Sequence, residues 1–153
     1  VSWENIKKGI LSFNPPSGRC VTYIKNGITI IDDTYNANLS STLSAIDYIS
    51  QLKLKGNKIM VFGDMLELGS KSNDHHKKVG LKVSNSNINQ LITFGENSFT
   101  TYKNTNLKNK NHFTSSEKLL YHLKNYINEG DAVLFKASRG MNFDALIKKV
   151  FKS

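Results

Sequence analysis

Apolar and polar residues follow a strand period in some segments of the chain and a helix period in others. The first segments with strand character predict a hairpin. Residues 19–25 alternate as in a half-buried strand, and residues 28–31 form a short apolar run typical of a buried strand. Asn26-Gly27 between them is the strongest short-range signal for a β-hairpin. We therefore expect an antiparallel pair of strands, of which the second leads into Asp32 and Asp33.

From Asp33 onward, the pattern repeats as a strand followed by a helix. Helical spacing of apolar residues predicts helices over 40–52, 74–84, 115–127 and 142–151. Short apolar runs predict strands over 58–62, 91–94, 112–114 and 132–135. This order predicts an α/β fold with a mostly parallel sheet, helices on both faces and right-handed connections. Residues 102–111, rich in Lys and Asn, are expected to form an exposed connection, and residues 2–13 a separate short helix.

The composition indicates a single domain. With 153 residues, of which 39% are hydrophobic and 22% charged, the chain is typical of a soluble globular protein and can bury a core. The one cysteine, Cys20, excludes a disulfide framework and a cysteine-based zinc site, and it fits a reducing, cytoplasmic location. No apolar run approaches the ~20 residues needed to span a membrane, and the N-terminus lacks a signal-peptide pattern.

The chain is basic, with 21 Lys and Arg against 12 Asp and Glu and a net charge of +9. A module that binds nucleic acid is one interpretation of this charge. The lysines are scattered and mixed with Asn, however, without the aromatic interleaving of single-strand platforms, so a solvated surface is favoured. Only two arginines occur, Arg19 and Arg139, and Arg is the preferred partner of phosphate and carboxylate groups.

Polar or glycine-rich loops follow four of the predicted strands, over 33–38, 63–67, 95–97 and 136–140. In a parallel sheet these loops gather at one edge, where α/β folds bind their ligands. Arg139 beside Ser138 suits a carboxylate, whereas Asp33 suits a ribose hydroxyl, a magnesium-bound water or a turn. Asn36 and Asn38 suit a base or an amide, although Asn38 is also the expected helix N-cap.

Motifs for a metal or for phosphate groups are missing from the sequence. The four histidines, at 75, 76, 112 and 122, have no metal-ligand spacing. Neither GxxxxGK[ST] nor GxGxxG occurs. If the chain handles a nucleotide, another domain must supply most of the site.

Four stretches together resemble one family. They are Gly18-Arg19, NGITIIDDTYNAN over 26–38, VFGDMLELG over 61–69 and KASRGM over 136–141. In this order and spacing they are similar to the C-terminal domain of the Mur ligases, over nearly the whole chain. GDMLELG and SRGM look most like the member that uses D-Ala-D-Ala. The resemblance implies a Rossmann-like, three-layer domain over 18–153, preceded over 1–17 by the tail of a central domain and a hinge.

The resemblance also implies an activity for a longer, three-domain enzyme of peptidoglycan precursor synthesis. That enzyme uses ATP to phosphorylate the carboxylate of UDP-N-acetylmuramoyl-tripeptide, and the amine of D-Ala-D-Ala then attacks the acyl phosphate. In the family, the central domain carries the phosphate loop and the Mg²⁺ ligands, and the N-terminal domain binds the UDP-sugar. Both are expected to lie outside this chain. We therefore expect no catalytic residue and no metal ligand in it, and no activity of the chain alone.

Individual residues match functional positions of the family. The residues that match the ATP side are Arg19, Asp33, Tyr35, Asn36 and Asn38. Those that match the D-Ala-D-Ala side are Lys136, Ser138 and Arg139, with Asp64 and Met65 in a matching motif. His76 matches a histidine of the family without an assigned role.

Two positions depart from the family pattern. Leu39 replaces a usual proline, which is expected to cost some rigidity at the start of a helix. Ala137 replaces a usual glycine and adds a methyl group beside the dipeptide loop. Two alternative functions stay open from the sequence. One is a related ligase with another amino acid or a folate as substrate, and the other is the basic nucleic-acid-binding module.

Overall fold

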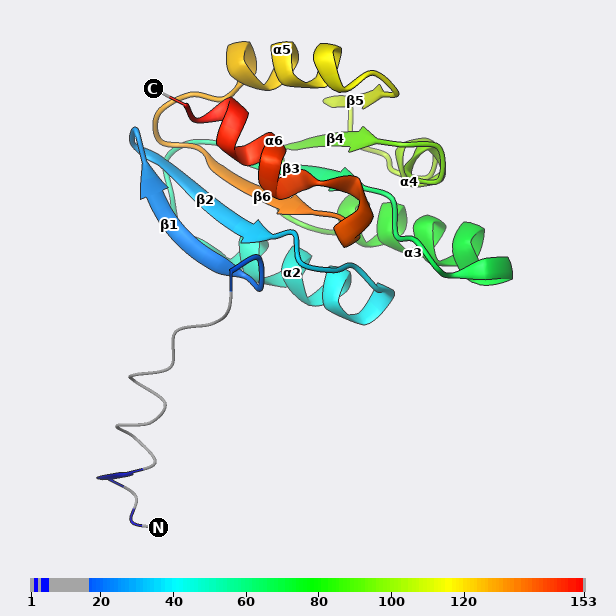
Figure 1. Ribbon diagram of the computed structural model, residues 1–153, viewed down its shortest axis with the longest axis horizontal. Coiled ribbons are helices and arrows are strands. Elements are labelled where there is room, and N and C mark those ends of the chain that lie inside the picture. The colour runs from blue at the N-terminus through cyan, green and yellow to red at the C-terminus, as the bar shows by residue number, and fades with distance from the viewer. Residues whose placement is uncertain (1, 3, 6–16, 153) are drawn as a thin grey trace.

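A six-stranded sheet with helices on both faces forms the folded part of the chain (Figure 1). The computed structural model describes Ser2, Glu4, Asn5 and residues 17–152. The helix expected over 2–13 and the tail and hinge expected over 1–17 therefore lie almost wholly outside the described residues. The strands are β1 (Val21–Lys25), β2 (Ile28–Asp33), β3 (Lys58–Gly63), β4 (Gln90–Phe94), β5 (Lys110–Phe113) and β6 (Ala132–Lys136).

The strand order is β1-β2-β6-β3-β4-β5. Only the β1–β2 pair is antiparallel, and all the other pairs are parallel. The turn of this pair is Asn26-Gly27, with φ of 52° and 72°, the left-handed conformations that a two-residue hairpin turn requires. The predicted hairpin and the predicted parallel sheet are both confirmed.

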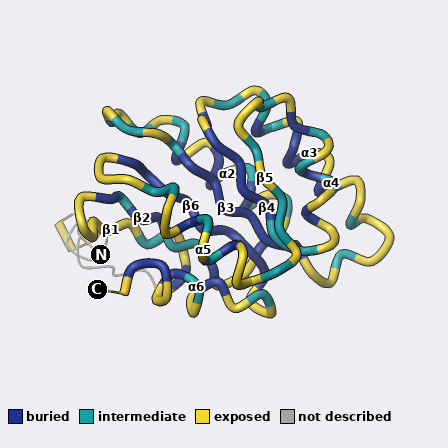
Figure 2. The backbone as a smooth tube through the Cα atoms, turned by 90° about the horizontal axis from the view of Figure 1, so that it is seen from above, coloured by how far each residue is buried: buried dark blue, intermediate teal, exposed yellow. Residues whose placement is uncertain are grey.

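Helices cover the two faces of the sheet as separate layers. On one face lie α5 (Ser116–Tyr126) and α6 (Phe143–Val150), packed on the side chains of alternate strand residues. On the other lie α2 (Leu39–Gln51) and α3 (Ser72–Ser84), with α4 (Ser98–Lys103) against α3 (Figure 1). Short 3₁₀ turns, η1 (Gly69–Lys71) and η2 (Arg139–Met141), precede α3 and α6. The central strands are buried along their length (Figure 2).

The segment around α4 differs from the prediction. Residues 102 and 103 belong to a helix, Thr105 is buried, and β5 begins at Lys110 instead of at 112. The Lys110 ammonium donates hydrogen bonds to the carbonyls of Tyr102 and Thr105, at 3.0 and 2.7 Å. The prediction of an exposed connection over 102–111 was thus wrong at both ends, because a six-residue helix is too short to show a period.

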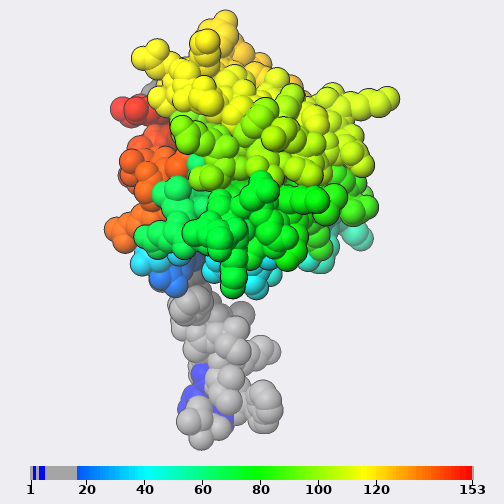
Figure 3. All heavy atoms as spheres, turned by 90° about the vertical axis from the view of Figure 1, so that its right-hand side faces the viewer, coloured from blue at the N-terminus to red at the C-terminus, as the bar shows by residue number. Residues whose placement is uncertain are grey.

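The sheet order decides where the functional loops lie. Because β6 lies between β2 and β3, the loops that follow these three parallel strands leave the same edge side by side. Figure 3 looks onto this edge and shows segments that are distant in sequence, coloured cyan, green and orange, in one surface. The expected gathering of loops is confirmed for β2, β3, β4 and β6.

Candidate functional site

A buried ion pair joins the ends of β2 and β6. The Lys136 ammonium lies 2.7 Å from the Asp33 carboxylate and donates a second hydrogen bond, at 2.6 Å, to the carbonyl of Asn36. The Lys136 side chain is 1% exposed and that of Asp33 14%. The other carboxylate oxygen of Asp33 accepts a hydrogen bond from the backbone N–H of Cys20 at 3.0 Å. Asp33 therefore links β6 to the turn that carries Arg19.

Asp32, the neighbour of Asp33, has a local role. Its carboxylate accepts hydrogen bonds from the hydroxyl and the backbone N–H of Thr34, at 2.7 and 3.3 Å. Successive strand residues point to opposite faces, so only one acid of the pair faces Lys136. The structure assigns the turn to Asp32 and the ion pair to Asp33.

The Tyr35 ring lies close to both arginines. The guanidinium of Arg19 lies 4.1 Å from the ring centroid, and that of Arg139 lies 5.5 Å from it. Both distances fall in the range of cation–π attraction. The backbone N–H of Tyr35 donates to the carbonyl of Gly18 at 2.8 Å, which fixes the ring beside Arg19. The two arginines of the chain, 120 residues apart in sequence, thus both contact one aromatic side chain.

The loop after Tyr35 is held by its own amide groups. The side-chain oxygen of Asn36 accepts from the N–H of Ala37 at 2.9 Å, and that of Asn38 accepts from the N–H of Ser41 at 2.8 Å. Asn38 is the N-cap of α2 in a capping box with Ser41. The expected cap is confirmed, and it fixes the start of the helix where Leu39 replaces the usual proline.

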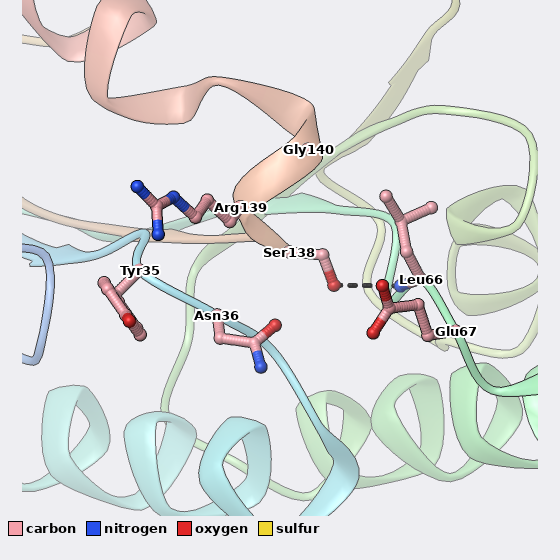
Figure 4. A pocket seen from close by; sticks show the side chains of 7 residues that line it. All are labelled: Tyr35, Asn36, Leu66, Glu67, Ser138, Arg139 and Gly140. Atoms are coloured by element: carbon pink, nitrogen blue, oxygen red, sulfur yellow. Dashed lines mark hydrogen bonds between the residues drawn. The ribbon is translucent and has the colours of Figure 1, made fainter.

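Two adjacent cavities open beside this loop. One, of about 330 Å³, is lined by Arg19, Asp33, Tyr35, Asn36, Asn38, Ser41 and Lys136 and is called the Lys136 cavity below. The other, of about 310 Å³, is lined by Tyr35, Asn36, Leu66, Glu67, Ser138, Arg139 and Gly140 and is called the Arg139 cavity (Figure 4). Tyr35 and Asn36 belong to both, so the cavities share a wall.

Ser138 ties three loops together at the Arg139 cavity. Its hydroxyl oxygen accepts a hydrogen bond from the N–H of Leu66 at 2.8 Å (Figure 4). The hydroxyl also lies 3.5 Å from the carbonyl of Ala37, to which it donates. The loops after β2, β3 and β6 are thereby held in one arrangement.

Asp64 and Met65 lie beneath this surface and do not line either cavity. Asp64 is 5% exposed, and its carboxylate accepts from the N–H groups of Asn97 and Ser98, at 3.2 and 2.7 Å. It thus satisfies free donors at the start of α4. Met65 is 1% exposed and contacts Thr42. Both residues therefore support the loop after β3 from inside the protein.

His76 supports the same loop from α3. The N–H of Met65 donates to Nε2 of His76 at 3.1 Å, and Nδ1 of His76 lies 2.8 Å from the carbonyl of Ser72. These partners require a neutral ring with its proton on Nδ1. The ring is fully buried, and burial lowers the pKa of His76 below its ordinary value of 6.5.

Several lining residues were not singled out from the sequence. Ser41, Leu66, Glu67 and Gly140 are the additional residues of the two cavities. Glu67 and Leu66 lie within the GDMLELG stretch, which was the available signal. In the part of the chain that the structure describes, no three His, Cys, Asp or Glu side chains form a group that could hold a metal ion. No helix among the described residues is long and apolar enough to cross a membrane.

The arrangement can bind two anionic or polar groups side by side. The Lys136 cavity offers the Arg19 guanidinium, amide groups and the Asp33–Lys136 pair. The Arg139 cavity offers a guanidinium, a hydroxyl and a carboxylate. The guanidinium, ammonium, amide and hydroxyl groups that line the two cavities can bind and orient a ligand.

Comparisons with known proteins agree with this fold. Residues 18–139 match the family model "Mur ligase, glutamate ligase domain", and the chain belongs to this family. UDP-N-acetylmuramoyl-tripeptide–D-alanyl-D-alanine ligase of Bacillus subtilis is 36% identical over 156 residues, 98% of this chain and 34% of the relative. MurF from Acinetobacter baumannii superposes with a TM-score of 0.88 at 26% identity, over 100% of this chain and 34% of that one.

MurF ligase from Thermotoga maritima was solved in complex with ADP. It superposes with a TM-score of 0.76 at 27% identity, over 91% of this chain and 31% of that one. The chain thus spans about a third of the length of the relatives that it matches. The three-layer α/β fold expected from the resemblance is confirmed by these structures.

Proposed function

We propose that this chain is the C-terminal domain of a cytoplasmic ligase that uses ATP to join D-Ala-D-Ala to UDP-N-acetylmuramoyl-tripeptide. Residues 18–153 would form this domain, with residues 1–17 as the tail of a central domain and a hinge. Central and N-terminal domains of the same protein would be its partners. The observation that carries the proposal is the pair of adjacent cavities that share Tyr35 and Asn36, in a chain of this family.

The Lys136 cavity suits one end of ATP. Arg19 reaches the phosphates, and Asp33 with the amide loop of Asn36 and Asn38 receives the ribose and base side. When bound, ATP supplies the phosphoryl group that activates the tripeptide carboxylate for attack by an amine. Lys136 holds Asp33 in position and adds positive charge beside the nucleotide. Mg²⁺ would be held by the central domain, since the described residues offer no ligand set for it.

The Arg139 cavity suits the incoming dipeptide. Arg139 can receive its C-terminal carboxylate, and Ser138 fixes the loop that presents the guanidinium. Asp64 and Met65 are buried, and their hydrogen bonds hold the loop after β3 and the start of α4 in position beneath this surface. A nucleotide and an amine held against one shared wall suit a reaction in two steps, in which ATP transfers a phosphoryl group to a carboxylate and releases ADP, and the amine then attacks that carbonyl and displaces phosphate.

Substitution of Arg139 in the full-length enzyme tests the proposal. With Arg139→Ala, kcat/KM for D-Ala-D-Ala should fall by about 10- to 100-fold, because a charged hydrogen bond is worth about 1.5–3 kcal/mol. The KM for ATP should change little. Lys118→Ala, on the exposed start of α5, is a matched loss of a cation and should leave both constants unchanged. Near-normal kinetics of the Arg139 variant would remove the assigned role.

A substrate panel on the same enzyme separates the alternatives. Release of ADP with D-Ala-D-Ala, and not with single amino acids or glutamate on a folate, is the expected result. If ADP is released only with a single amino acid or with glutamate on a folate, the domain belongs to a related ligase.

A further inference from the structure

The Arg139 cavity is lined by two side chains of opposite charge. Of its seven lining residues, Glu67 and Arg139 are the charged ones, and Ser138, Asn36 and Tyr35 add polar groups. Figure 4 shows the Glu67 carboxylate and the Arg139 guanidinium on different sides of the cavity, with Ser138 and Asn36 between them. The two come from the loops after β3 and β6. Among the ion pairs of the described residues, neither charge takes part.

The backbone directs Glu67 to this place at some cost. Its φ is +62°, a left-handed conformation that residues other than glycine seldom adopt. Strain of this kind is kept mostly at functional sites, where it places a side chain. Gly69, two residues later, also has a positive φ, of 53°, and the chain bends at Glu67. The strain thus accompanies the exposure of a carboxylate at the cavity.

We propose that Glu67 binds the ammonium group of the incoming dipeptide, while Arg139 binds its carboxylate. This inference rests on the proposed function and names the group that selects a zwitterionic amino substrate. A dipeptide in extended form separates its two charges by about 7 Å, so opposite walls of one cavity are the natural places for the partners.

Ligands that lack one charge at a time test the assignment. The full-length enzyme is compared with D-Ala-D-Ala, with D-alanyl-D-alaninamide, which lacks the carboxylate, and with N-acetyl-D-Ala-D-Ala, which lacks the ammonium. Glu67→Gln should raise KM for the first two by about 10-fold or more, because a charged partner is lost. It should leave the inhibition constant of the N-acetyl compound within about twofold, since that ligand has no ammonium to lose.

Arg139→Lys should show the opposite pattern. It should weaken the binding of D-Ala-D-Ala and of the N-acetyl compound, because Lys lacks the planar fork that pairs with a carboxylate. It should leave the KM for the amide within about twofold. Glu96→Gln, an exposed acid at the same sheet edge that does not line the cavity, is the matched control and should change no constant.

The outcomes separate this inference from the proposed function. If the wild-type enzyme turns over D-Ala-D-Ala and Glu67→Gln has an unchanged KM, the inference fails and the proposed function stands. If Glu67→Gln weakens all three ligands equally, Glu67 shapes the loop and the inference also fails. If the wild-type enzyme does not use D-Ala-D-Ala at all, both fail.

Discussion

The charge of Lys136 is buried at the carboxyl ends of the central strands. Neighbouring polar and acidic groups stabilise it there. The Asp33 carboxylate and the Asn36 carbonyl both lie within 2.7 Å of the ammonium. A buried pair of this kind is weak as a source of stability when intact, but the loss of one partner leaves an uncompensated charge.

Lys136→Met should therefore destabilise the chain by about 3 kcal/mol, since the Asp33 carboxylate would lose its cationic partner. Urea unfolding of the 153-residue chain measures the change. Lys108→Met, an exposed lysine, should change the stability by less than about 0.5 kcal/mol. A similar small change for Lys136→Met would show that solvent reaches Asp33 in the native state.

His76 makes stability depend on pH. Its folded-state pKa is lowered by burial, so the unfolded chain binds the proton more tightly. The contribution of His76 is fully present above its ordinary pKa of 6.5 and is lost as the pH falls from there through the folded pKa.

His76→Gln should be less stable than wild type at pH ~7.5 and should lose less further stability between pH ~7.5 and ~5. Urea midpoints across this range measure both effects. Asn109→Gln, an exposed substitution that changes no titratable group, should keep the slope of the wild type. Equal slopes in wild type and His76→Gln would show that the ring does not titrate in this range.

At the scale of elements, Gly80 explains how α3 and α4 pack. A Cβ at this position would lie 2.7 Å from the carbonyl oxygen of Thr101 and 3.0 Å from the carbonyl carbon of Asn104. The sequence shows only a glycine inside a helix, which lowers helix propensity. The structure shows that α4 needs the absence of a side chain there.

Gly80→Ala should destabilise the chain by about 1–2 kcal/mol, although alanine is the better helix former by about 1 kcal/mol. The backbone of α4 cannot move away as a flexible side chain would. Thermal unfolding of the variant gives the sign. Lys77→Ala, on the exposed face of α3, should be nearly neutral or slightly stabilising. A gain of stability for Gly80→Ala would mean that α4 is free to shift.

Elements with a local cause could be predicted from the sequence. The Asn26-Gly27 turn and the Asn38 cap depend on residues within a few positions of one another. By contrast, α4 begins where the Asp64 carboxylate, 34 residues earlier, accepts from the N–H of Ser98. A distant partner of this kind leaves no periodic pattern in the local sequence. For this reason the sequence did not predict α4 or the true start of β5.

At the scale of the whole molecule, the site was predicted in part. Arg19, Asp33, Tyr35, Asn36 and Asn38, which the family resemblance gave to ATP, line one cavity. Lys136 lines that cavity too, although the resemblance matched it to the dipeptide side. Glu67 was predicted only as part of the 63–67 loop, because a left-handed backbone at a residue other than glycine cannot be read from a single sequence.

The proposed division of the reaction between domains gives a further prediction. The 153-residue chain alone should release no phosphate from ATP in the presence of both substrates, because it contains no phosphate loop. A phosphate-release assay with full-length enzyme as the positive control measures this. Measurable turnover by the chain alone would place catalytic groups within it. A lack of salt-dependent DNA binding in the same preparation would remove the nucleic-acid alternative.

The central position of β6 has a consequence for how the protein is made. β6 pairs with β2 and with β3, and Asp33 lies opposite Lys136, 103 residues later in the sequence. During synthesis, the β1–β2 hairpin and the strands from β3 to β5 emerge from the ribosome long before the strand that unites them.

Until residues 132–136 have been translated, two apolar strand edges stay without their shared partner. Folding of the sheet must therefore wait for the last part of the chain and must close a long loop, which makes it slow. The nascent protein is most prone to aggregation in this interval, and chaperones that shield open strand edges should bind it then.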